Sequence, residues 1–205
     1  MITVIAGVNG AGKSSVVGAY LRKIGGDYFN PDEYTRYLLA THPDWDLGRA
    51  NAEAWGYGAQ RLEEALALGL NYAFETTLGG QTIINLLVAG AEAGQPVSVF
   101  YVGLDSAQLH IDRVAARVSR GGHAIPEDRI RSRYTTSVLN MTRLAECCTR
   151  LQVWDNSTPL DAHGHAQPKR LLSTQEASVQ FVLQHGMPEW AKPIATASLL
   201  RMQRG

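Results

Sequence analysis

Short apolar runs rich in β-branched residues alternate along the chain with longer stretches in which apolar residues recur every three or four positions. Four of the five runs are almost continuously apolar, as strands buried on both faces of a parallel sheet are. This alternation predicts an α/β fold of three layers, in which helices flank a parallel five-stranded sheet. The predicted strands are Ile2 to Ala6, Asp27 to Phe29, Tyr72 to Glu75, Val97 to Gly103 and Leu151 to Trp154.

Helical spacing fills the intervals between these runs. Gly121 and Gly122 stop one helical pattern, and Pro126 followed by two acidic residues predicts the first turn of the next helix. The segment from Asp155 to Lys169 is rich in Pro, Gly, His and Asp and predicts a loop, and a final helix is expected near Leu171 to Gln184. The apolar positions that predict the four earlier helices are Val17, Leu21 and Ile24; Trp55, Ala59, Leu62 and Leu66; Ile83, Leu87 and Ala91; and Ile111, Val114 and Val118.

The composition is that of a globular protein, with 45% hydrophobic and 19% charged residues among 205. A chain of this size buries a sufficient core without staples, and without a linker or repeat we expect one domain over residues 1–205. Nineteen Lys and Arg balance nineteen Asp and Glu, so no basic field predicts a nucleic-acid partner. Because no basic leader and no window of about 18 apolar residues occurs, we expect a cytoplasmic protein without a membrane partner.

A glycine-rich loop carries the strongest chemical signal. Gly7-Val8-Asn9-Gly10-Ala11-Gly12-Lys13-Ser14 matches GxxxxGK(S/T), directly after an apolar strand and before a helical pattern. Glycines let the backbone curl so that its N–H groups meet the phosphates of ATP. We expect Lys13 to reach the β- and γ-phosphates and Ser14 to bind Mg²⁺. The predicted ATP-binding residues are Gly7, Asn9, Gly10, Ala11, Gly12, Lys13, Ser14 and Ser15.

Two classes of P-loop protein fit the chain poorly. A guanine-specific GTPase needs an NKxD-type run, which the sequence lacks. An oligomeric ATPase usually carries paired acidic residues after an apolar strand, whereas Asp105 stands without an acidic neighbour. A kinase is therefore favoured among the classes that share this loop.

Two carboxylates follow predicted strands at the sheet edge where α/β proteins bind ligands. Asp32 can take the proton of an attacking hydroxyl, or it can cap the helix that follows Pro31. Glu75 closes an apolar strand, where a carboxylate needs a ligand or a cation, so it either orients the acceptor or pairs with an arginine. Thr77 is a weaker candidate, since a threonine there can equally cap a helix.

Arginines on two helix faces predict a helical lid over about residues 113–135. Arg113, Arg117 and Arg120 share one face, and Arg129 and Arg133 repeat the spacing beyond a connector from Gly121 to Ile125. Guanidinium groups that close on the triphosphate stabilise the transferring phosphoryl group, and we expect Arg117 and Arg120 to do so; a solvated basic face is the alternative. His123 is expected at the hinge or against the substrate, because no second metal ligand stands near it.

Beyond the phosphate loop, three further segments resemble the zeta-toxin family of P-loop kinases. Asp155-Asn156-Ser157 and Pro188-Glu189-Trp190-Ala191 resemble a compact branch of it. The three segments are Phe29-Asn30-Pro31-Asp32-Glu33-Tyr34-Thr35-Arg36, Phe74-Glu75-Thr76-Thr77-Leu78, and Arg113 to Arg133 with Gly121-Gly122-His123-Ala124-Ile125-Pro126. The resemblance covers Met1 to about Ala191.

This resemblance implies a nucleotide-kinase-like fold, ATP with Mg²⁺, and phosphorylation of a UDP-activated amino sugar. It also suggests an antitoxin protein as a partner. The aspartate of the family's second strand matches Asp32, the arginine after it matches Arg36, and His42-Pro43 follows. The family's Glu-x-Thr of the third strand matches Glu75 and Thr77. We therefore expect Asp32 to be catalytic and Arg36, Glu75 and Thr77 to contact the substrate. The Gly-Gly-His connector departs from the toxin archetype, so the acceptor remains open between an amino sugar, a nucleoside, an antibiotic hydroxyl and a polynucleotide end. A switch module that turns ATP over slowly is the non-kinase alternative.

Overall fold

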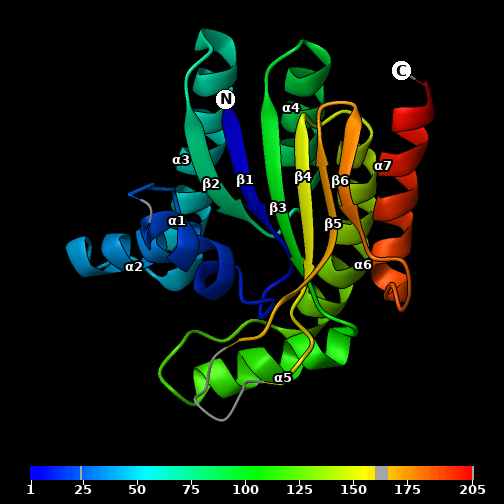
Figure 1. The fold of residues 1–205 in the computed structure, drawn as a ribbon. Helices are drawn as coiled ribbons and strands as arrows, with labels where there is room; N and C mark the ends of the chain where they lie inside the picture. Colours follow the sequence, from blue (N-terminus) through cyan, green and yellow to red (C-terminus); the bar gives the residue numbers. More distant parts are fainter. Residues whose placement is uncertain (24, 160–165, 205) are drawn as a thin grey trace.

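The computed structural model describes residues 1–23, 25–159 and 166–204, and they form one mixed sheet of six strands (Figure 1). The strand order is β2-β1-β3-β4-β5-β6. The first four strands run parallel, whereas β5 and β6 form an antiparallel hairpin on the β4 edge. The strands are β1 (Ile2–Ala6), β2 (Tyr72–Thr76), β3 (Val97–Gly103), β4 (Arg150–Asp155), β5 (Lys169–Gln175) and β6 (Ser178–Val182).

The helices connect the strands and end at residues that explain their boundaries. Asn30 caps one helix with its side-chain oxygen, and Gly69 ends the longest helix in the left-handed conformation, with φ of 66°. The helical elements are η1 (Ser14–Gly18), α1 (Ala19–Lys23), α2 (Pro31–Thr41), α3 (Leu47–Leu68), α4 (Gln81–Glu92), α5 (Ala107–Val118), α6 (Glu127–Ala145), η2 (Glu189–Ala191) and α7 (Lys192–Arg204). None of the described helices is long and apolar enough to cross a membrane.

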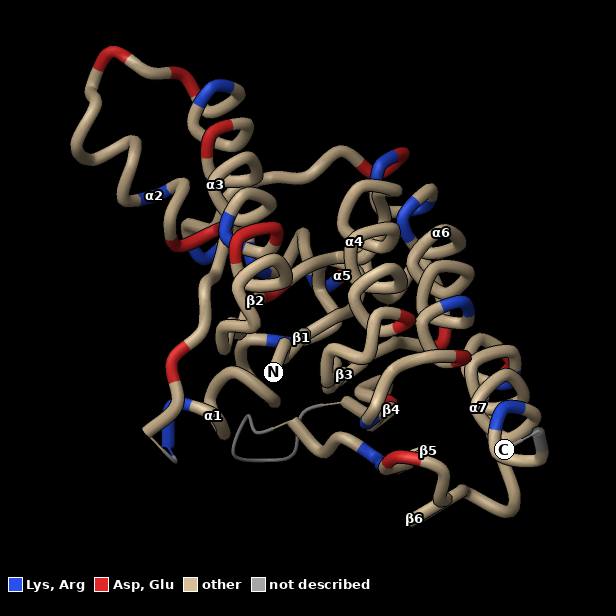
Figure 2. The backbone as a smooth tube through the Cα atoms, turned by 90° about the horizontal axis from the view of Figure 1, so that it is seen from above, with Lys and Arg blue, Asp and Glu red and all other residues tan. Residues whose placement is uncertain are grey.

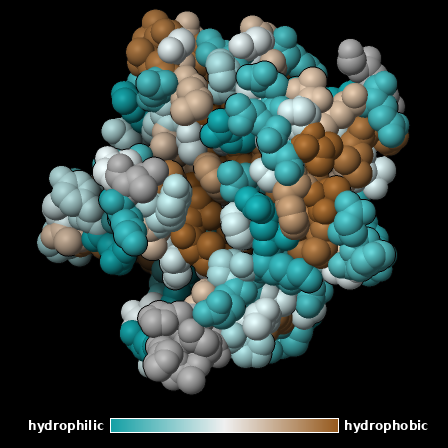
Figure 3. All heavy atoms as spheres, viewed as in Figure 1, coloured by the Kyte–Doolittle hydropathy of each residue, from teal (hydrophilic) through white to brown (hydrophobic). Residues whose placement is uncertain are grey.

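Helices cover the two faces of the sheet unequally (Figures 1 and 2). Helices α3, α4, α6 and α7 pack on one face, where alternate residues of β1 such as Ile2 and Val4 join the main core. The opposite face carries η1 and α1, with Val17 and Tyr28 packed on Ile5. On that face Figure 3 shows hydrophobic surface beside α1 and again near β6 and α7. The three-layer α/β architecture is therefore confirmed, with one thick and one thin helical layer.

The C-terminal part of the sheet corrects the sequence prediction. The helix predicted near Leu171 to Gln184 is wrong, because β5 and β6 occupy this segment, and the predicted all-parallel five-stranded sheet is a mixed six-stranded one. The turn between these strands uses Glu176 at φ of 53°, so no glycine marks a hairpin in the sequence. The segment forms strands because β5 pairs with the edge of β4, which would otherwise be open, and this pairing outweighs the local helical spacing.

The structure differs from the sequence prediction in two smaller ways, near the β2 edge of the sheet and in the loop after β4. The strand predicted at Asp27 to Phe29 reduces to a single bridge between Phe29 and Phe74, and α2 begins two residues later at Pro31. Of the loop predicted from Asp155 to Lys169, residues 160–165 lie outside the described residues, as does Ile24 of the first predicted helix.

Candidate active site

The phosphate loop joins β1 to η1 at the carboxyl edge of the sheet. Gly10 and Gly12 have φ values of 82° and 90°, which side chains rarely permit. Lys13 already has helical backbone angles and begins the helix, so the loop meets a helix N-terminus as an anion site requires. The loop therefore has the local geometry that the motif predicts.

Three side chains of the predicted nucleotide site meet at one carboxylate. Lys13 Nζ lies 3.4 Å from Glu75 Oε1, and Ser14 Oγ donates a hydrogen bond to Glu75 Oε2 at 2.7 Å. The side chains of Lys13 and Glu75 are only 7% and 10% exposed. The parallel register of β1 and β2 causes this meeting, because it places Glu75 beside Ile5 at the strand end that leads into the loop. The predicted arginine partner of Glu75 is thus a lysine instead.

The donor set beside Lys13 fits Mg²⁺ only in part. Ser14 and Glu75 supply hard oxygen atoms, which Mg²⁺ prefers. Among the described residues no group of three His, Cys, Asp or Glu side chains could hold a metal ion. A magnesium ion here would therefore complete its shell with phosphate oxygens and water, as it commonly does in kinases.

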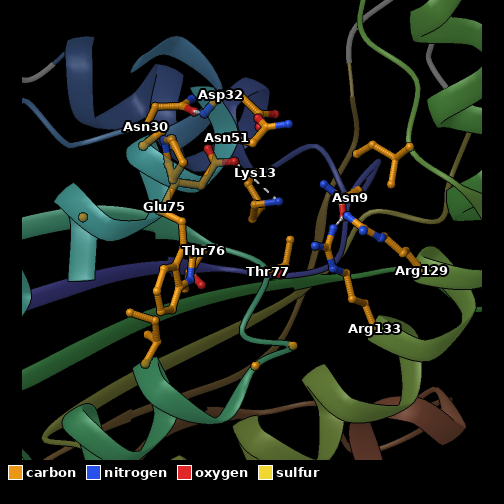
Figure 4. A pocket seen from close by; sticks show the side chains of 18 of the residues that line it. Asn9, Lys13, Asn30, Asp32, Asn51, Glu75, Thr76, Thr77, Arg129 and Arg133 are labelled. Atoms are coloured by element: carbon orange, nitrogen blue, oxygen red, sulfur yellow. Dashed lines mark hydrogen bonds and ion pairs between the residues drawn. The ribbon is translucent and has the colours of Figure 1, made fainter. Parts of the chain in front are cut away.

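A pocket of about 660 Å³ opens from these residues between α2, α3, the end of β2 and α6 (Figure 4). Asp32 and Asn51 stand on one side of it, and Arg129 and Arg133 on the other. Lys13 lies between the two walls, and Glu75 lies on the side of Asp32 and Asn51. The pocket thus places carboxylates, a lysine and arginines around one space.

Asp32 occupies the first turn of α2 without capping it. The cap is Asn30, whose side-chain oxygen accepts from the N–H groups of Asp32 and Glu33. The Asp32 carboxylate instead faces the segment predicted as a lid, 3.7 Å from Arg117 and 3.9 Å from His123. Its side chain is 42% exposed, so it remains open to the pocket. The capping alternative for Asp32 is therefore wrong.

The arginines divide between pocket and surface. Arg133 donates to Asn9 Oδ1 at 2.8 Å, and burial, followed by the Arg129 charge, lowers the pKa of Arg133. Arg117 lies beside the pocket, with one nitrogen donating to His123 O. Arg113 donates instead to Thr158 O, and Arg120 is exposed and does not line the pocket. The geometry therefore adds Arg129 and Arg133 to the candidates and leaves Arg120 on the surface.

The remaining predicted site residues lie at different depths. Thr77 and His123 line the pocket. Arg36 is exposed on α2, bonds only the backbone oxygen of Asp32 and does not line the pocket. Ser15 is exposed on η1, one residue beyond the lysine and serine that meet Glu75.

Two residues of α3 line the pocket although the sequence analysis did not assign them to the site. Trp55 is assigned to the apolar helix face by its spacing, yet it is 53% exposed and lines the pocket. Asn51, one turn earlier, accepts from Thr35 Oγ1 at 3.0 Å, which leaves its amide N–H₂ available as a donor. Nothing in the spacing distinguishes these positions from ordinary helix residues.

Two further side chains contact the loop backbone: His110, which the sequence analysis missed, and Asn156, which it named only within Asp155-Asn156-Ser157. His110 Nδ1 lies 2.8 Å from Asn9 O, and Asn156 Nδ2 donates to Ala11 O at 2.9 Å. Burial lowers the pKa of His110 to about 4, so the ring is neutral near neutral pH. The two contacts come from α5 and from the segment after β4.

Comparison with known proteins places this loop in a family. Residues 2–136, about two thirds of the chain, match the AAA domain family AAA_33. The chain belongs to this AAA domain family. An uncharacterized protein of Haemophilus influenzae is 29% identical to it over 133 residues, which cover 62% of this chain and 88% of that protein.

Solved structures identify the fold of this AAA domain. A chain of the AvrRxo1-ORF1:AvrRxo1-ORF2 complex with sulphate ions matches with a TM-score of 0.63 at 14% identity, and a structure of that complex with ATP matches with 0.57. A chain of the PezAT chromosomal toxin-antitoxin system of Streptococcus pneumoniae matches with 0.53 at 14% identity. The alignments cover 97% and 99% of this chain, and 63% and 85% of the AvrRxo1 and PezAT chains.

The family and the structural likeness together show a zeta-toxin-like P-loop kinase fold with an ATP-binding loop. The expected family resemblance is thereby confirmed. The chain spans less than two thirds of the length of the AvrRxo1 chain that it matches.

Proposed function

We propose that the chain is an ATP-dependent kinase that transfers the γ-phosphoryl group to a hydroxyl of a small acceptor, with a UDP-activated amino sugar as the first candidate. The observation that carries this proposal is the shared pocket of Asp32, Lys13 and Glu75 at the end of the phosphate loop. Asp32 does not cap its helix and shares the pocket with the lysine of the phosphate loop. This arrangement suits transfer to a hydroxyl acceptor better than a nucleotide switch.

On the nucleotide side, the Gly-rich backbone and the helix N-terminus hold the phosphates. When ATP binds, Lys13 moves from Glu75 to the β- and γ-phosphates. Ser14 would hold Mg²⁺ through its hydroxyl oxygen, and the ion would offset the phosphate charge. Glu75, freed from both contacts, can accept a hydrogen bond from an acceptor hydroxyl. The contacts that support this step are the two that Glu75 makes to Lys13 and Ser14.

On the acceptor side, the hydroxyl oxygen attacks the γ-phosphorus while its proton passes to Asp32. The bond between the γ-phosphorus and the bridging oxygen breaks, and ADP leaves. Arg129 and Arg133, with Arg117 beside them, offset the charge on the transferring group. The pairs that Asp32 makes with Arg117 and His123 support a lid that closes over the base.

The α3 wall of the pocket supports an acceptor that carries a ring. The exposed Trp55 offers a flat aromatic face, and Phe29 and Phe74 line the space near it. Asn51 offers amide donors to oxygen atoms of the same ligand. A nucleotide-activated sugar combines a planar base with several hydroxyl groups, which is why it comes first among the acceptors.

An antitoxin protein is the macromolecular partner proposed here. Its support is the fold, since PezAT is described as a toxin-antitoxin system. The test is co-expression: a chain that arrests growth alone and is tolerated with a neighbouring gene product has such a partner, whereas a chain that is harmless at high level does not.

The activity is tested with ATP labelled at the γ-phosphate. Purified protein is incubated with UDP-N-acetylglucosamine, a nucleoside, an aminoglycoside and a DNA 5′ end in separate reactions. Label in one acceptor supports the kinase and names its substrate class. Label that appears only as inorganic phosphate in every reaction supports the slow ATPase switch and refutes the kinase.

A further inference from the structure

Two buried side chains from distant parts of the chain hold two backbone carbonyls of the phosphate loop. His110 is 1% exposed and Asn156 is 3% exposed, and they contact Asn9 O and Ala11 O. Because a carbonyl only accepts, His110 Nδ1 carries the hydrogen in this contact. Asn156 Oδ1 has no hydrogen-bond partner among the described residues, so the bond to Ala11 is the one that orients this side chain.

The planarity of the peptide bond converts these contacts into an orientation of N–H groups. The Asn9 carbonyl shares its peptide with the N–H of Gly10, and the Ala11 carbonyl shares its peptide with the N–H of Gly12. In a trans peptide the C=O and N–H point in opposite directions. Holding both carbonyls outward therefore turns the N–H groups of Gly10 and Gly12 to the inner side of the loop. Neither N–H donates to another backbone group in the described part of the chain.

The loop needs such anchors because it is built on glycine. Gly10 and Gly12 adopt positive φ, where glycine allows a peptide to turn over at little cost. A turned peptide would present its carbonyl oxygen to the phosphates, and any population in that state lowers the apparent affinity for ATP in proportion. The surroundings also exclude other residues at both positions, since a Cβ at Gly10 would lie 2.7 Å from the backbone oxygen of His110 and one at Gly12 would lie 2.6 Å from Asn156 Nδ2.

We propose that His110 and Asn156 are positioning residues for nucleotide binding, which hold the Gly10 and Gly12 amides in the orientation that receives the phosphates of ATP. Their effect is exerted through the loop backbone. It concerns ATP binding alone and does not depend on which acceptor is phosphorylated, or on whether any acceptor is.

The test removes each donor while keeping the shape of the side chain. Asn156→Leu and His110→Phe lose the anchor, whereas His110→Gln keeps a donor. Gln108→Ala, two residues from His110 on the exposed side of α5, is the matched control. ATP affinity is measured by calorimetry, and the amide proton shifts of Gly10 and Gly12 are followed by NMR with and without ATP.

Each lost anchor should weaken ATP binding about 3- to 10-fold, the range of one net hydrogen bond. The ATP-induced downfield shift should shrink at Gly10 in His110→Phe and at Gly12 in Asn156→Leu, while His110→Gln and Gln108→Ala stay near wild type. If His110→Phe does not fold, Asn156→Leu and Asn156→Asp carry the test, since a carboxylate facing Ala11 O also lacks the donor. Wild-type affinity with unchanged glycine shifts in the Asn156 variants overturns the proposal, as does a lowered melting temperature without any loss of affinity.

Discussion

Replacing Glu75 with glutamine examines the contacts that hold Lys13 and Ser14 before nucleotide binds. Glutamine keeps the shape of the side chain and an acceptor for Ser14 Oγ, but it removes the negative charge 3.4 Å from Lys13 Nζ. Leaving the buried Lys13 cation without its partner should lower the free energy of unfolding by about 3 kcal/mol. This value is at the low end for buried pairs, because the pocket lets water approach Lys13. In a chain of this size that cost lowers the melting temperature by about 6–12 °C.

ATP should act on this variant in the opposite direction. In the wild type the phosphates compete with Glu75 for Lys13 and Ser14, whereas in Glu75→Gln no carboxylate opposes them and the phosphates supply the missing charge. The melting temperature with ATP and EDTA should therefore rise more in the variant than in the wild type. The assay is thermal unfolding of both proteins, with and without ATP.

The matched control is Glu64→Gln, which breaks the exposed Arg61–Glu64 pair on α3, where the side chains are 48% and 40% exposed. A surface pair contributes at most about 1 kcal/mol, so this change should be small with and without ATP. The reasoning about Glu75 is refuted by a wild-type melting temperature in Glu75→Gln without nucleotide, or by a smaller rise with ATP than in the wild type.

Three further changes have distinct readouts. Trp55→Ala should raise the KM for the acceptor about 10- to 100-fold, because it removes a stacking face. Trp45→Ala, outside the pocket, is the control. An unchanged KM in Trp55→Ala contradicts the binding of an acceptor ring at this wall. Gly121→Val strains a residue at φ of 87° and should lower kcat about tenfold. The control Gly94→Val, at φ of 85° and far from the pocket, should lower stability without changing kcat. Equal kcat values in the two variants contradict a hinge at Gly121. Burial, with Lys13 and Arg113 nearby, lowers the pKa of His110 to about 4, so unfolded but not folded protein gains this proton below pH 6.5. The free energy of unfolding should therefore fall by about 3 kcal/mol between pH 6.5 and pH 4. Unfolding measured as a function of pH should show a smaller fall in His110→Gln, whereas the control His185→Gln should behave like the wild type.

The parallel half of the sheet was predictable because local and tertiary signals agree there. The apolar runs that form β1 and β3 are buried on both faces, and the glycine-rich loop follows β1 as the motif demands. The hairpin was not predictable, because its turn residue Glu176 adopts a left-handed conformation without the usual glycine. The strands there are selected by the open edge of β4, which no local pattern reports.

The site divides in the same way. Residues that belong to a motif, such as Lys13 and Ser14, could be named from the sequence, and strand register then brings Glu75 to them. The spacing of arginines placed basic faces on α5 and α6 but did not tell which side chains face the pocket, because that depends on how these two helices pack. The spacing around Trp55 gave no sign that it lines a pocket. Asn156 was named only through the family resemblance, because its contact with Ala11 spans more than a hundred residues.

The most direct test of the proposed chemistry compares phosphoryl transfer by the wild type and by Asp32→Asn on the same acceptor. Asn30 caps α2 in both proteins, so the substitution leaves the helix intact and removes only the base. With γ-labelled ATP and the best acceptor of the panel, the account predicts that label moves to the acceptor in the wild type. In Asp32→Asn transfer should fall about 10²- to 10⁴-fold while ATP affinity and melting temperature stay unchanged. Equal transfer rates in the two proteins, or label found only as inorganic phosphate in both, would contradict it.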